Sequence, residues 1–307
     1  MKIQEKIAII IVTYNGEKWL NKCIKPLYSI ENIKIIVVDN ASSDNTVKEI
    51  SNLYPEVELI ISNKNLGFGQ ANNLGFEFAI KNNFDYVFLL NQDASIDINN
   101  LSMLVDSYKN DISIGILSPI HFMNEDEVEN VFKFYLSDNK LTLSDVGGVG
   151  VKEVNFVNAA LWLISVDKLS LMGGFNPLFF HYGEDVDYVN STISKKNKIC
   201  IDLNVKGFHY RNYNKEEFKN NFDKSRYFGP WNVKYYTVLS NVKSSFLKCI
   251  FRSLKLFIKS FLKYFMKGYF SSAFMSLKVY LNVISEINMI RKNRKIIQNE
   301  NFPFLNL

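Results

Sequence analysis

Short apolar runs alternate with amphipathic stretches along roughly the first ninety residues of the chain. The runs are apolar on both faces and rich in Ile and Val, which predicts strands covered on both sides of a sheet. The stretches between them repeat apolar residues at helical spacing. Strands are predicted at Ile7–Thr13, Ile33–Asp39, residues 57–62 and Tyr86–Leu90, and helices at residues 17–29, 44–53 and 69–82. This alternation predicts an α/β fold with a Rossmann-like, mostly parallel sheet flanked by helices.

The pattern changes after residue 95. A helix is predicted at residues 101–108, and strands at residues 114–119 and 199–203. Residues 131–143 place two extended arms around the turn sequence Ser-Asp-Asn-Lys, which predicts a β-hairpin. A short helix is expected to end at the Gly173-Gly174 pair, because glycine commonly terminates helices.

The last part of the chain carries a third pattern, a basic amphipathic helix. Six cations recur every three or four residues and share about one third of the helix circumference: Lys248, Arg252, Lys255, Lys259, Lys263 and Lys267. Phe, Leu and Ile occupy the opposite side, and a second apolar helix is predicted at residues 274–290, before the basic run 291–295. This pattern favours a helix that lies in the plane of a membrane surface. The alternative is a helix packed on the rest of the protein with a solvated charged face.

Charge divides the chain in the same place. The whole chain of 307 residues has 36 Lys and Arg against 31 Asp and Glu, a net charge of +5. Residues 241–307 hold 12 of the basic residues and only Glu286 and Glu300, so they carry +10 and residues 1–240 carry −5. We therefore expect a catalytic domain at residues 1–215 and a basic helical region at residues 216–307, with a membrane surface as the partner of residues 243–295. Nucleic acid is not needed to explain the basic balance.

Other features of composition narrow the location. The three cysteines are scattered and form no C-x-x-C pair, so neither a disulfide framework nor a zinc site is expected. The chain contains no window of about 18 uncharged apolar residues, so no transmembrane helix is predicted. Charged residues stand where the apolar core of a signal peptide would begin. These features predict a cytoplasmic protein that is peripheral on the inner face of the plasma membrane.

Polar residues follow each of the four predicted strands of the first half. The four segments are Thr13-Tyr14-Asn15-Gly16, Asp39-Asn40-Ala41-Ser42-Ser43, residues 63–69 and Asn91-Gln92-Asp93. Ligands bind at the carboxyl ends of the strands in open parallel sheets, although each segment alone could be an ordinary turn. Neither a G-x-G-x-x-G nor a G-x-x-x-x-G-K-[ST] loop is present, so phosphate charge needs another partner. Asp93 suggests a divalent metal, and a helix cap is its alternative reading.

A second candidate site is an acidic cluster beside aromatic residues. Glu184, Asp185 and Asp187 lie within four residues, and their mutual repulsion should raise at least one pKa. A carboxylate with a raised pKa is a useful general base near neutral pH. The alternative is an acidic helix N-terminus favoured by the helix dipole. His209 is a third candidate, although a lone histidine is usually structural.

Five ordered segments resemble the inverting family 2 glycosyltransferases, most closely the rhamnosyltransferase-like branch. They are IIIVTYNG at residues 9–16, VVDNASSDNT at 37–46, NKNLGFGQANNLG at 63–75, LLNQDA at 89–94 and GGFNPLFFHYGEDVDY at 173–188. The similarity covers residues 5–210 approximately. It implies the GT-A fold, a nucleotide-diphosphate-sugar donor such as a dTDP- or UDP-sugar, and Mg²⁺ or Mn²⁺ as cofactor.

The resemblance also implies roles for individual residues. Thr13, Tyr14 and Asn15 would border the nucleotide and Asp39 would hold its base or ribose, while Asn65, Gly67 and Asn72 would line the donor. Asn91-Gln92-Asp93 occupies the family's D-x-D position, with Asn91 and Gln92 beside the donor and Asp93 on the metal. Asp185, the second residue of the Glu184-Asp185 pair, matches the general base, and His209 matches a histidine that completes the metal site.

Three positions depart from the family pattern. Asn91 replaces the first acid of D-x-D, and Asn176 stands where Gly-Gly-Phe-Asp is usual. His209 is followed by residues 210–213 (YRNY), where the family has Gly-x-Ser. These changes bear on metal affinity and on the role of His209.

The implied reaction is a single displacement with inversion, in which a sugar such as rhamnose or another hexose moves to a polyprenyl-linked or growing surface glycan. One rival is a nucleotide-sugar-modifying enzyme on a Rossmann-like sheet, which the missing glycine fingerprint disfavours. Another rival is a non-catalytic scaffold at the membrane surface.

Overall fold

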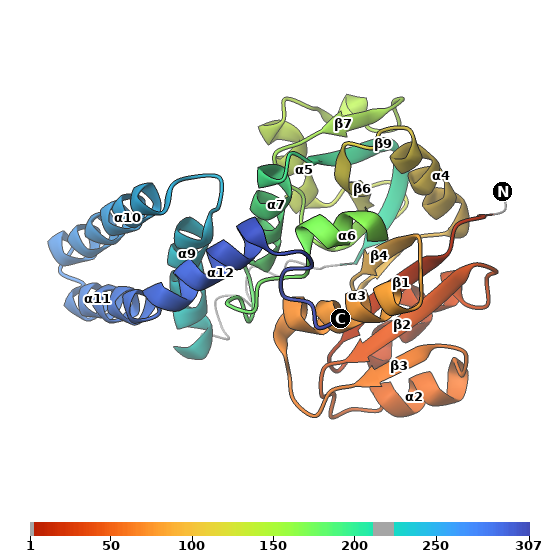
Figure 1. Cartoon of the computed structure of the whole chain (residues 1–307), viewed down its shortest axis with the longest axis horizontal. Coiled ribbons are helices and arrows are strands. Elements are labelled where there is room, and N and C mark those ends of the chain that lie inside the picture. The colour runs from red at the N-terminus through yellow and green to blue at the C-terminus, as the bar shows by residue number, and fades with distance from the viewer. Residues whose placement is uncertain (1–2, 211–223) are drawn as a thin grey trace.

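The structure is a computed structural model that describes residues 3–210 and 224–307, with side chains omitted for residues 224–231. Its described strands form one sheet in the order β3-β2-β1-β4-β8-β6-β9-β5, and β7 pairs with β9 (Figure 1). In chain order the strands are β1 (Ile7–Thr13), β2 (Ile33–Asp39), β3 (Glu58–Ile61), β4 (Tyr86–Leu90), β5 (Ala94–Ser95), β6 (Ile114–Phe122), β7 (Val151–Glu153), β8 (Leu161–Ser165) and β9 (Lys198–His209).

The sheet is parallel in its first half and mixed in its second. β1 pairs in parallel with both β2 and β4, and β2 with β3, as the sequence predicts. β8 is antiparallel to both of its neighbours, β4 and β6, so those two strands run in the same direction. β9 is parallel to β6, whereas β5 and β7 run antiparallel to β9. The carboxyl ends of β1, β2 and β4 thus meet at one edge, and Thr13 lies opposite Asp39.

Helices cover both faces of the sheet because side chains alternate along each strand. In β1, Ile7, Ile9 and Ile11 point into one apolar core, whereas Ala8 and Ile10 point into the other. The first core is closed by α1 (Leu20–Cys23) and α4 (Ile98–Lys109), and the second by α3 (Gly67–Lys81), α5 (Asn130–Asp138), α6 (Val166–Met172) and α7 (Glu184–Ser194). α2 (Thr46–Leu53) follows β2.

Three local predictions are wrong. Residues 131–143 form no hairpin: α5 spans most of them, since Phe132 and Leu136 are four residues apart and both point into the core. The helix predicted at residues 17–29 is broken into η1 (Glu17–Trp19), α1 and η2 (Lys25–Leu27), where Pro26 cannot continue a regular helix. Strand β9 continues to His209 and so is longer than residues 199–203.

Four helices form a lobe beside the sheet, called the helical module below (Figure 1). They are α9 (Lys224–Ser240), α10 (Phe246–Met266), α11 (Phe270–Ser285) and α12 (Ile287–Asn299), so the predicted helix 274–290 is divided at Glu286. Tyr235, Val279 and Val283 are at the centre of their own apolar core. The expected domain boundary at residues 215 and 216 lies outside the described residues and stays a prediction. None of the helices in the described chain combines the length and apolar character needed to span a bilayer.

The last residues return to the part of the chain that carries the sheet, called the body (residues 3–210). The backbone N–H of Gly174 donates to Pro303 O at 2.8 Å, and Phe302 N donates to Ser170 O at 2.9 Å. The Asn73 side chain of α3 donates to Phe304 O at 3.4 Å. The segment 302–306 therefore ties α3 and α6 together.

Candidate functional site

Three of the predicted turns are joined at the carboxyl ends of the parallel strands. Gln92, after β4, accepts hydrogen bonds from the Thr13 hydroxyl at 2.8 Å and from Tyr14 N at 3.1 Å, after β1. Asn15 accepts from Ser43 N at 2.8 Å and donates its own N–H to the Ser42 hydroxyl at 2.9 Å, after β2. Residues that are 27 to 79 positions apart in the sequence thus form one rim.

Asp39 lies beneath this rim and is 1% exposed. One carboxylate oxygen accepts from Ser42 N at 3.1 Å, and the other, Oδ1, is buried with no hydrogen-bond partner among the described residues. A buried acceptor without a donor is uncommon in native proteins, and a ligand hydroxyl or N–H is one way to supply the donor. This geometry agrees with the predicted role of Asp39 toward a base or ribose.

The loop after β3 is shaped by Asn40, which the sequence reading missed. Its amide donates to Asn65 Oδ1 at 3.0 Å, and its Oδ1 accepts from Leu66 N at 2.7 Å. Gly67 follows with φ of +78°, and a Cβ there would lie 2.0 Å from Phe180 O. Only glycine allows this approach, which brings the loop against the segment that leads to α7.

Two further residues predicted to line the sugar donor are Asn72 and Asn91, and both make hydrogen bonds within the fold. Asn72 is buried and donates to Phe68 O within α3 at 3.0 Å, and Asn91 N donates to Ala160 O at 2.9 Å beside β8. The donor-lining roles of both side chains stay predictions.

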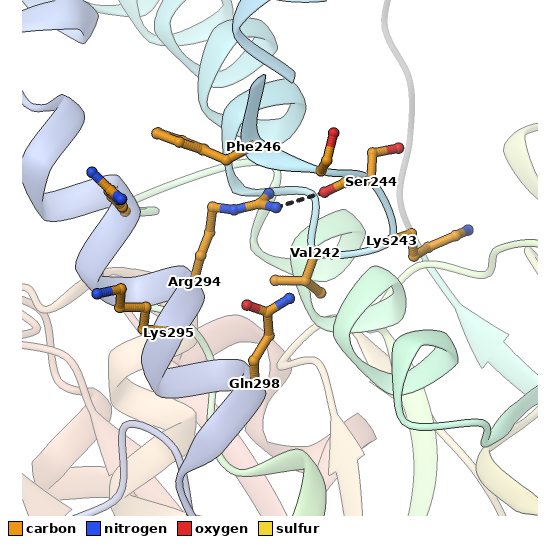
Figure 2. A pocket seen from close by; sticks show the side chains of 9 residues that line it. Val242, Lys243, Ser244, Phe246, Arg294, Lys295 and Gln298 are labelled. Atoms are coloured by element: carbon orange, nitrogen blue, oxygen red, sulfur yellow. Dashed lines mark hydrogen bonds between the residues drawn. The ribbon is translucent and has the colours of Figure 1, made fainter. Parts of the chain in front are cut away.

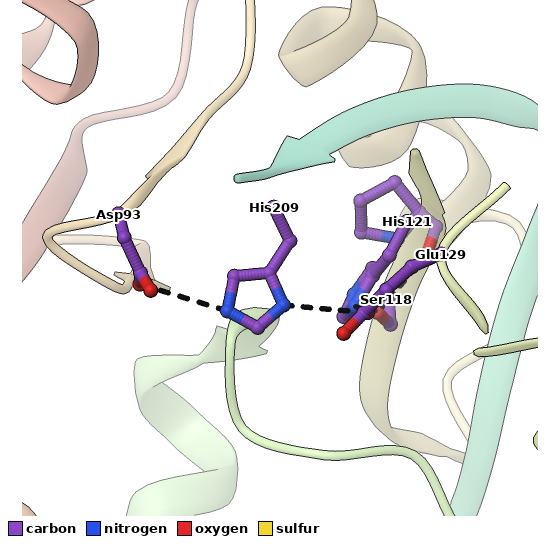
Figure 3. A network of polar contacts seen from close by, with 6 residues as sticks. Asp93, Ser118, His121, Glu129 and His209 are labelled. Atoms are coloured by element: carbon purple, nitrogen blue, oxygen red, sulfur yellow. Dashed lines mark hydrogen bonds and ion pairs between the residues drawn. The ribbon is translucent and has the colours of Figure 1, made fainter. Parts of the chain in front are cut away.

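Asp93 and His209 meet where β5 pairs with the end of β9 (Figure 3). Asp93 Oδ1 is 3.6 Å from His209 Nε2, and His209 Nδ1 is 3.3 Å from Glu129 Oε2. Glu129 Oε2 is also 3.6 Å from His121 Nδ1, and His121 Nε2 is 3.0 Å from the Ser118 hydroxyl. The sequence reading missed Glu129 and His121 because residue 129 immediately precedes the helix that it misassigned as a hairpin.

The carboxylates around His209 decide its charge. Burial by itself would lower the His209 pKa, but contacts with Asp93 and Glu129 outweigh it and raise the pKa to about 9. Burial would raise the Glu129 pKa, but His121 and His209 bring it down to about 2. His121 is fully buried, which lowers its pKa to about 4 and keeps it neutral. Without a metal, His209 therefore carries a proton between two carboxylates.

The residues fit a divalent metal. A separation of 3.6 Å between Asp93 Oδ1 and His209 Nε2 is longer than a strong hydrogen bond, and it suits two ligands that share an ion at about 2.1 Å. Glu129 contacts Nδ1 of His209 and leaves Nε2 facing Asp93, as carboxylates that orient a metal-binding histidine do. His121, Glu129 and His209 also place ligand atoms within 4.8 Å of one another. A set with one carboxylate and one imidazole suits Mn²⁺ better than Mg²⁺.

The acidic cluster begins α7. Gly183 precedes it with φ of +86°, a left-handed conformation that glycine tolerates. Burial, and then the neighbouring Asp185, raises the Glu184 pKa to about 7. Burial likewise raises the Asp187 pKa to about 7, although Asn176 donates to it at 3.1 Å. Of these two residues, the mutual repulsion expected from the sequence contributes only to the Glu184 pKa, and there it comes after burial. Asp185 is the partly exposed member of the cluster.

The body therefore has the GT-A architecture: a mixed sheet flanked by helices, with a rim of joined polar turns, a carboxylate-imidazole pair and an acidic helix start. A family model described as "Glycosyl transferase family 2" matches residues 8–145. The matched residues, just under half of the chain, thus resemble a family 2 glycosyltransferase domain.

Relatives and solved structures agree with this assignment. Glycosyltransferase GlyA of Streptococcus pneumoniae is 28% identical over 69% of this chain and 31% of its own length. The dTDP-rhamnosyl transferase RfbF of Shigella flexneri is 27% identical over 41% of each chain. The chain thus spans less than half the length of both relatives. The crystal structure of S. aureus TarS with UDP-GlcNAc has a TM-score of 0.55 at 14% identity and covers 95% of this chain and 86% of that one, which shows a shared fold.

Proposed function

We propose that the chain transfers a sugar, rhamnose or another hexose, from a dTDP- or UDP-sugar to a lipid-linked or growing bacterial surface glycan, with inversion at the anomeric carbon. The observation that carries the proposal is the meeting of Asp93 and His209 at 3.6 Å on the strand edge that also holds Asp39. The rhamnosyl relative and the TarS complex with UDP-GlcNAc support the donor class.

The residues of the strand edge would bind the donor. The orphaned oxygen of Asp39 accepts a hydrogen bond from the nucleoside, and the rim of Thr13, Tyr14 and Asn15 borders it. Asp93 and His209 would hold Mn²⁺ or Mg²⁺, which when bound supplies positive charge to the leaving diphosphate. Asn91 adds no charge here, so the metal depends on these two ligands and on the phosphate oxygens.

Asp185 would be the general base. It is partly exposed at the first turn of α7, whereas Glu184 beside it is buried, so the two acids have separate environments. Asp185 takes the proton from the acceptor hydroxyl as that oxygen attacks the anomeric carbon from the side opposite the diphosphate. Glu184 packs against Gly69 at the start of α3, which fixes the helix start beside the donor loop. A single base without an enzyme nucleophile gives inversion.

Helix α10 would hold the protein on the membrane. The apolar side expected from the sequence is divided: Ile250 and Phe257 pack toward α9 and α11, and a separate row stays between 40% and 63% exposed. That row is Leu247, Phe251, Leu254, Ile258, Leu262 and Phe265. On the helix it lies beside the stripe of six cations, an arrangement that suits an anionic bilayer surface. A position on the inner face of the plasma membrane follows, where a polyprenyl-linked acceptor is accessible.

The catalytic part is tested by a donor screen. Purified chain is mixed with UDP-, dTDP- or GDP-sugars and polyprenyl-diphosphate-linked acceptors, with and without Mn²⁺, and nucleoside diphosphate release is measured. We expect release from one donor class that depends on Mn²⁺, with an inverted product by NMR. No release from any donor with any acceptor would remove the enzyme proposal and favour a scaffold.

The membrane part is tested by flotation with anionic liposomes. Changing Phe251 and Ile258 together to serine removes exposed apolar surface, so the protein should leave the liposome fraction without a change in melting temperature. The matched control is Phe257→Ser on the packed side, which should lower the melting temperature instead. Flotation of the Phe251/Ile258 variant at the wild-type level would contradict membrane docking through this row.

A further inference from the structure

A cavity of about 370 Å³ lies in the helical module where α10 begins and α12 ends. The turn between α9 and α10 forms one wall and the polar side of α12 forms the other (Figure 2). The residues that line it are Val242, Lys243, Ser244, Ser245, Phe246, Arg291, Arg294, Lys295 and Gln298. This cavity is separate from the strand-edge site, and the resemblance to glycosyltransferases assigns it no role.

The charged residues that line this cavity are all positive. Four of its lining residues are Lys or Arg, and none is acidic. The two acids that follow residue 240 are directed elsewhere: Glu286 accepts from the Tyr236 hydroxyl at 2.6 Å, and Glu300 lines a different cavity beside α3. Among the described residues, no ion pair within 4 Å joins an acid to any of the four cations. The cavity is therefore strongly positive and attracts an anion.

Arg294 makes part of the cationic wall rigid. It is 5% exposed, and its guanidinium donates to the carbonyl oxygens of Leu239 at 3.0 Å and Ser244 at 2.6 Å. The Phe246 ring lies 5.3 Å from the guanidinium carbon. The groups that hold the guanidinium in place are neutral, and the acid that acts on its charge, Asp187 of the body, makes no ion pair with it within 4 Å. A cation that is fixed before binding loses little freedom when an anion arrives.

The start of α10 adds to the field. The Ser245 hydroxyl caps this 21-residue helix by accepting from Lys248 N at 3.4 Å, and the positive end of the helix dipole lies at the cavity wall. Phosphate oxygens match this combination of ammonium, guanidinium and hydroxyl donors.

The cavity adjoins the surface proposed to face lipid. Ser245 lines it and also lines a neighbouring groove with Leu247 and Phe251, the first two members of the exposed apolar row of α10. A phosphate in the cavity would therefore be close to an apolar surface on which an acyl or prenyl chain could lie. We propose that the cavity binds the phosphate group of a lipid headgroup. The lipid part of this inference rests on the proposed membrane docking, whereas the phosphate part does not.

The first experiment measures phosphate binding without a membrane. Full-length chain in EDTA is titrated with pyrophosphate by calorimetry, so the metal-dependent strand edge does not contribute. The cavity variant changes Lys243, Arg291 and Lys295 to alanine; all three side chains are exposed, so the fold should tolerate the loss. The matched control changes Lys259, Lys263 and Lys267 to alanine. These three belong to the cationic stripe of α10 and lie outside the cavity.

We expect the cavity variant to bind pyrophosphate at least about tenfold more weakly than wild type, and the stripe variant to change by less than about twofold. Equally weakened pyrophosphate binding in both variants would overturn the proposal, because general surface charge would then explain the binding without the cavity. Absence of binding to the wild type would overturn it as well.

The second experiment identifies the source of the phosphate. Flotation is compared on phosphatidylcholine vesicles that contain either phosphatidylglycerol or undecaprenyl diphosphate. If the cavity variant floats less than wild type only with phosphatidylglycerol vesicles, the phosphate belongs to a bilayer headgroup. If it floats less only with undecaprenyl diphosphate vesicles, the phosphate belongs to a lipid-linked acceptor. Equal flotation of wild type and cavity variant on both would overturn the lipid assignment. Pyrophosphate binding without any flotation would instead contradict membrane docking.

Discussion

Among the described residues that can carry charge at neutral pH, those buried in the body are acids and histidines, whereas the one buried in the helical module is Arg294. Of the buried acids, Glu129 contacts both His121 and His209. Arg294 is satisfied by backbone carbonyl oxygens. The buried cation of the module thus has neutral partners, whereas Glu129 of the body faces an imidazole that carries a proton. The ligands proposed for the two regions are of opposite charge as well, a metal ion in the body and a phosphate group in the module.

The largest expected effect tests the exposed acid of the body. Asp185→Asn removes the proposed base while keeping its shape, so nucleoside diphosphate release with acceptor should fall about 10²- to 10⁴-fold. The melting temperature should stay unchanged, because Asp185 is partly exposed. Glu184→Gln is the neighbouring comparison, and a larger loss there than in Asp185→Asn would move the role of base to Glu184.

The next effect tests the buried cation of the module. Arg294→Met removes the donor to the Leu239 and Ser244 carbonyls and leaves them unpaired, so the free energy of unfolding should fall by about 3 kcal/mol. Arg291→Met, three residues earlier on an exposed position, should change it little. Denaturant titration measures both variants. Equal stability of the two would contradict a structural role for the buried guanidinium.

A smaller effect tests how the body orients His209, one of the two residues proposed to bind the metal. Glu129→Gln weakens the contact that orients His209, so Mn²⁺ affinity should fall about 10- to 100-fold in a calorimetric titration. Glu127→Gln is a matched control, since Glu127 is exposed and contacts Lys133 instead. If the two variants bind Mn²⁺ alike, Glu129 does not position the histidine.

The smallest effect concerns Asp187. Burial raises its pKa to about 7, above the roughly 3.9 of an unfolded aspartate, so the folded state holds a proton that the unfolded state has lost between these values. The free energy of unfolding should therefore decrease as the pH rises through this window. Asp187→Asn should flatten the decrease and stabilise the protein by about 1 kcal/mol near pH 8. An unchanged slope in thermal melts across pH 4 to 8 would show that Asp187 is ionised throughout.

Asn176 connects the two regions. Its amide donates to Asp187 at 3.1 Å, and its oxygen accepts from Asn293 of α12 at 2.8 Å. The aspartate usual at this position would place a second carboxylate beside Asp187 and would lose the amide donor. The departure noticed in the sequence thus has a structural reason in this chain.

Local sequence patterns were sufficient to predict which residues lie at the carboxyl ends of the parallel strands. The apolar strands and the polar residues that follow them lie within a few positions of each other, so Asp39, Gln92 and Asp93 could be identified from the sequence. Asn40, Glu129 and His121 could not, because their importance comes from pairing between β6 and β9 and from loops far apart in the chain. The division of the apolar side of α10 also depends on which neighbours α9 and α11 cover, which periodicity alone does not specify.

The segment 302–306 has a consequence for the order of synthesis. Gly174 and Asn73 donate hydrogen bonds to the carbonyl oxygens of Pro303 and Phe304. A ribosome makes residue 73 long before residue 304, so these bonds form only after all four helices of the module have emerged. A nascent chain stalled within α12 would carry a sheet whose segment before α7 is still untied. The contacts of this segment are therefore expected to form late, when translation has passed the helical module.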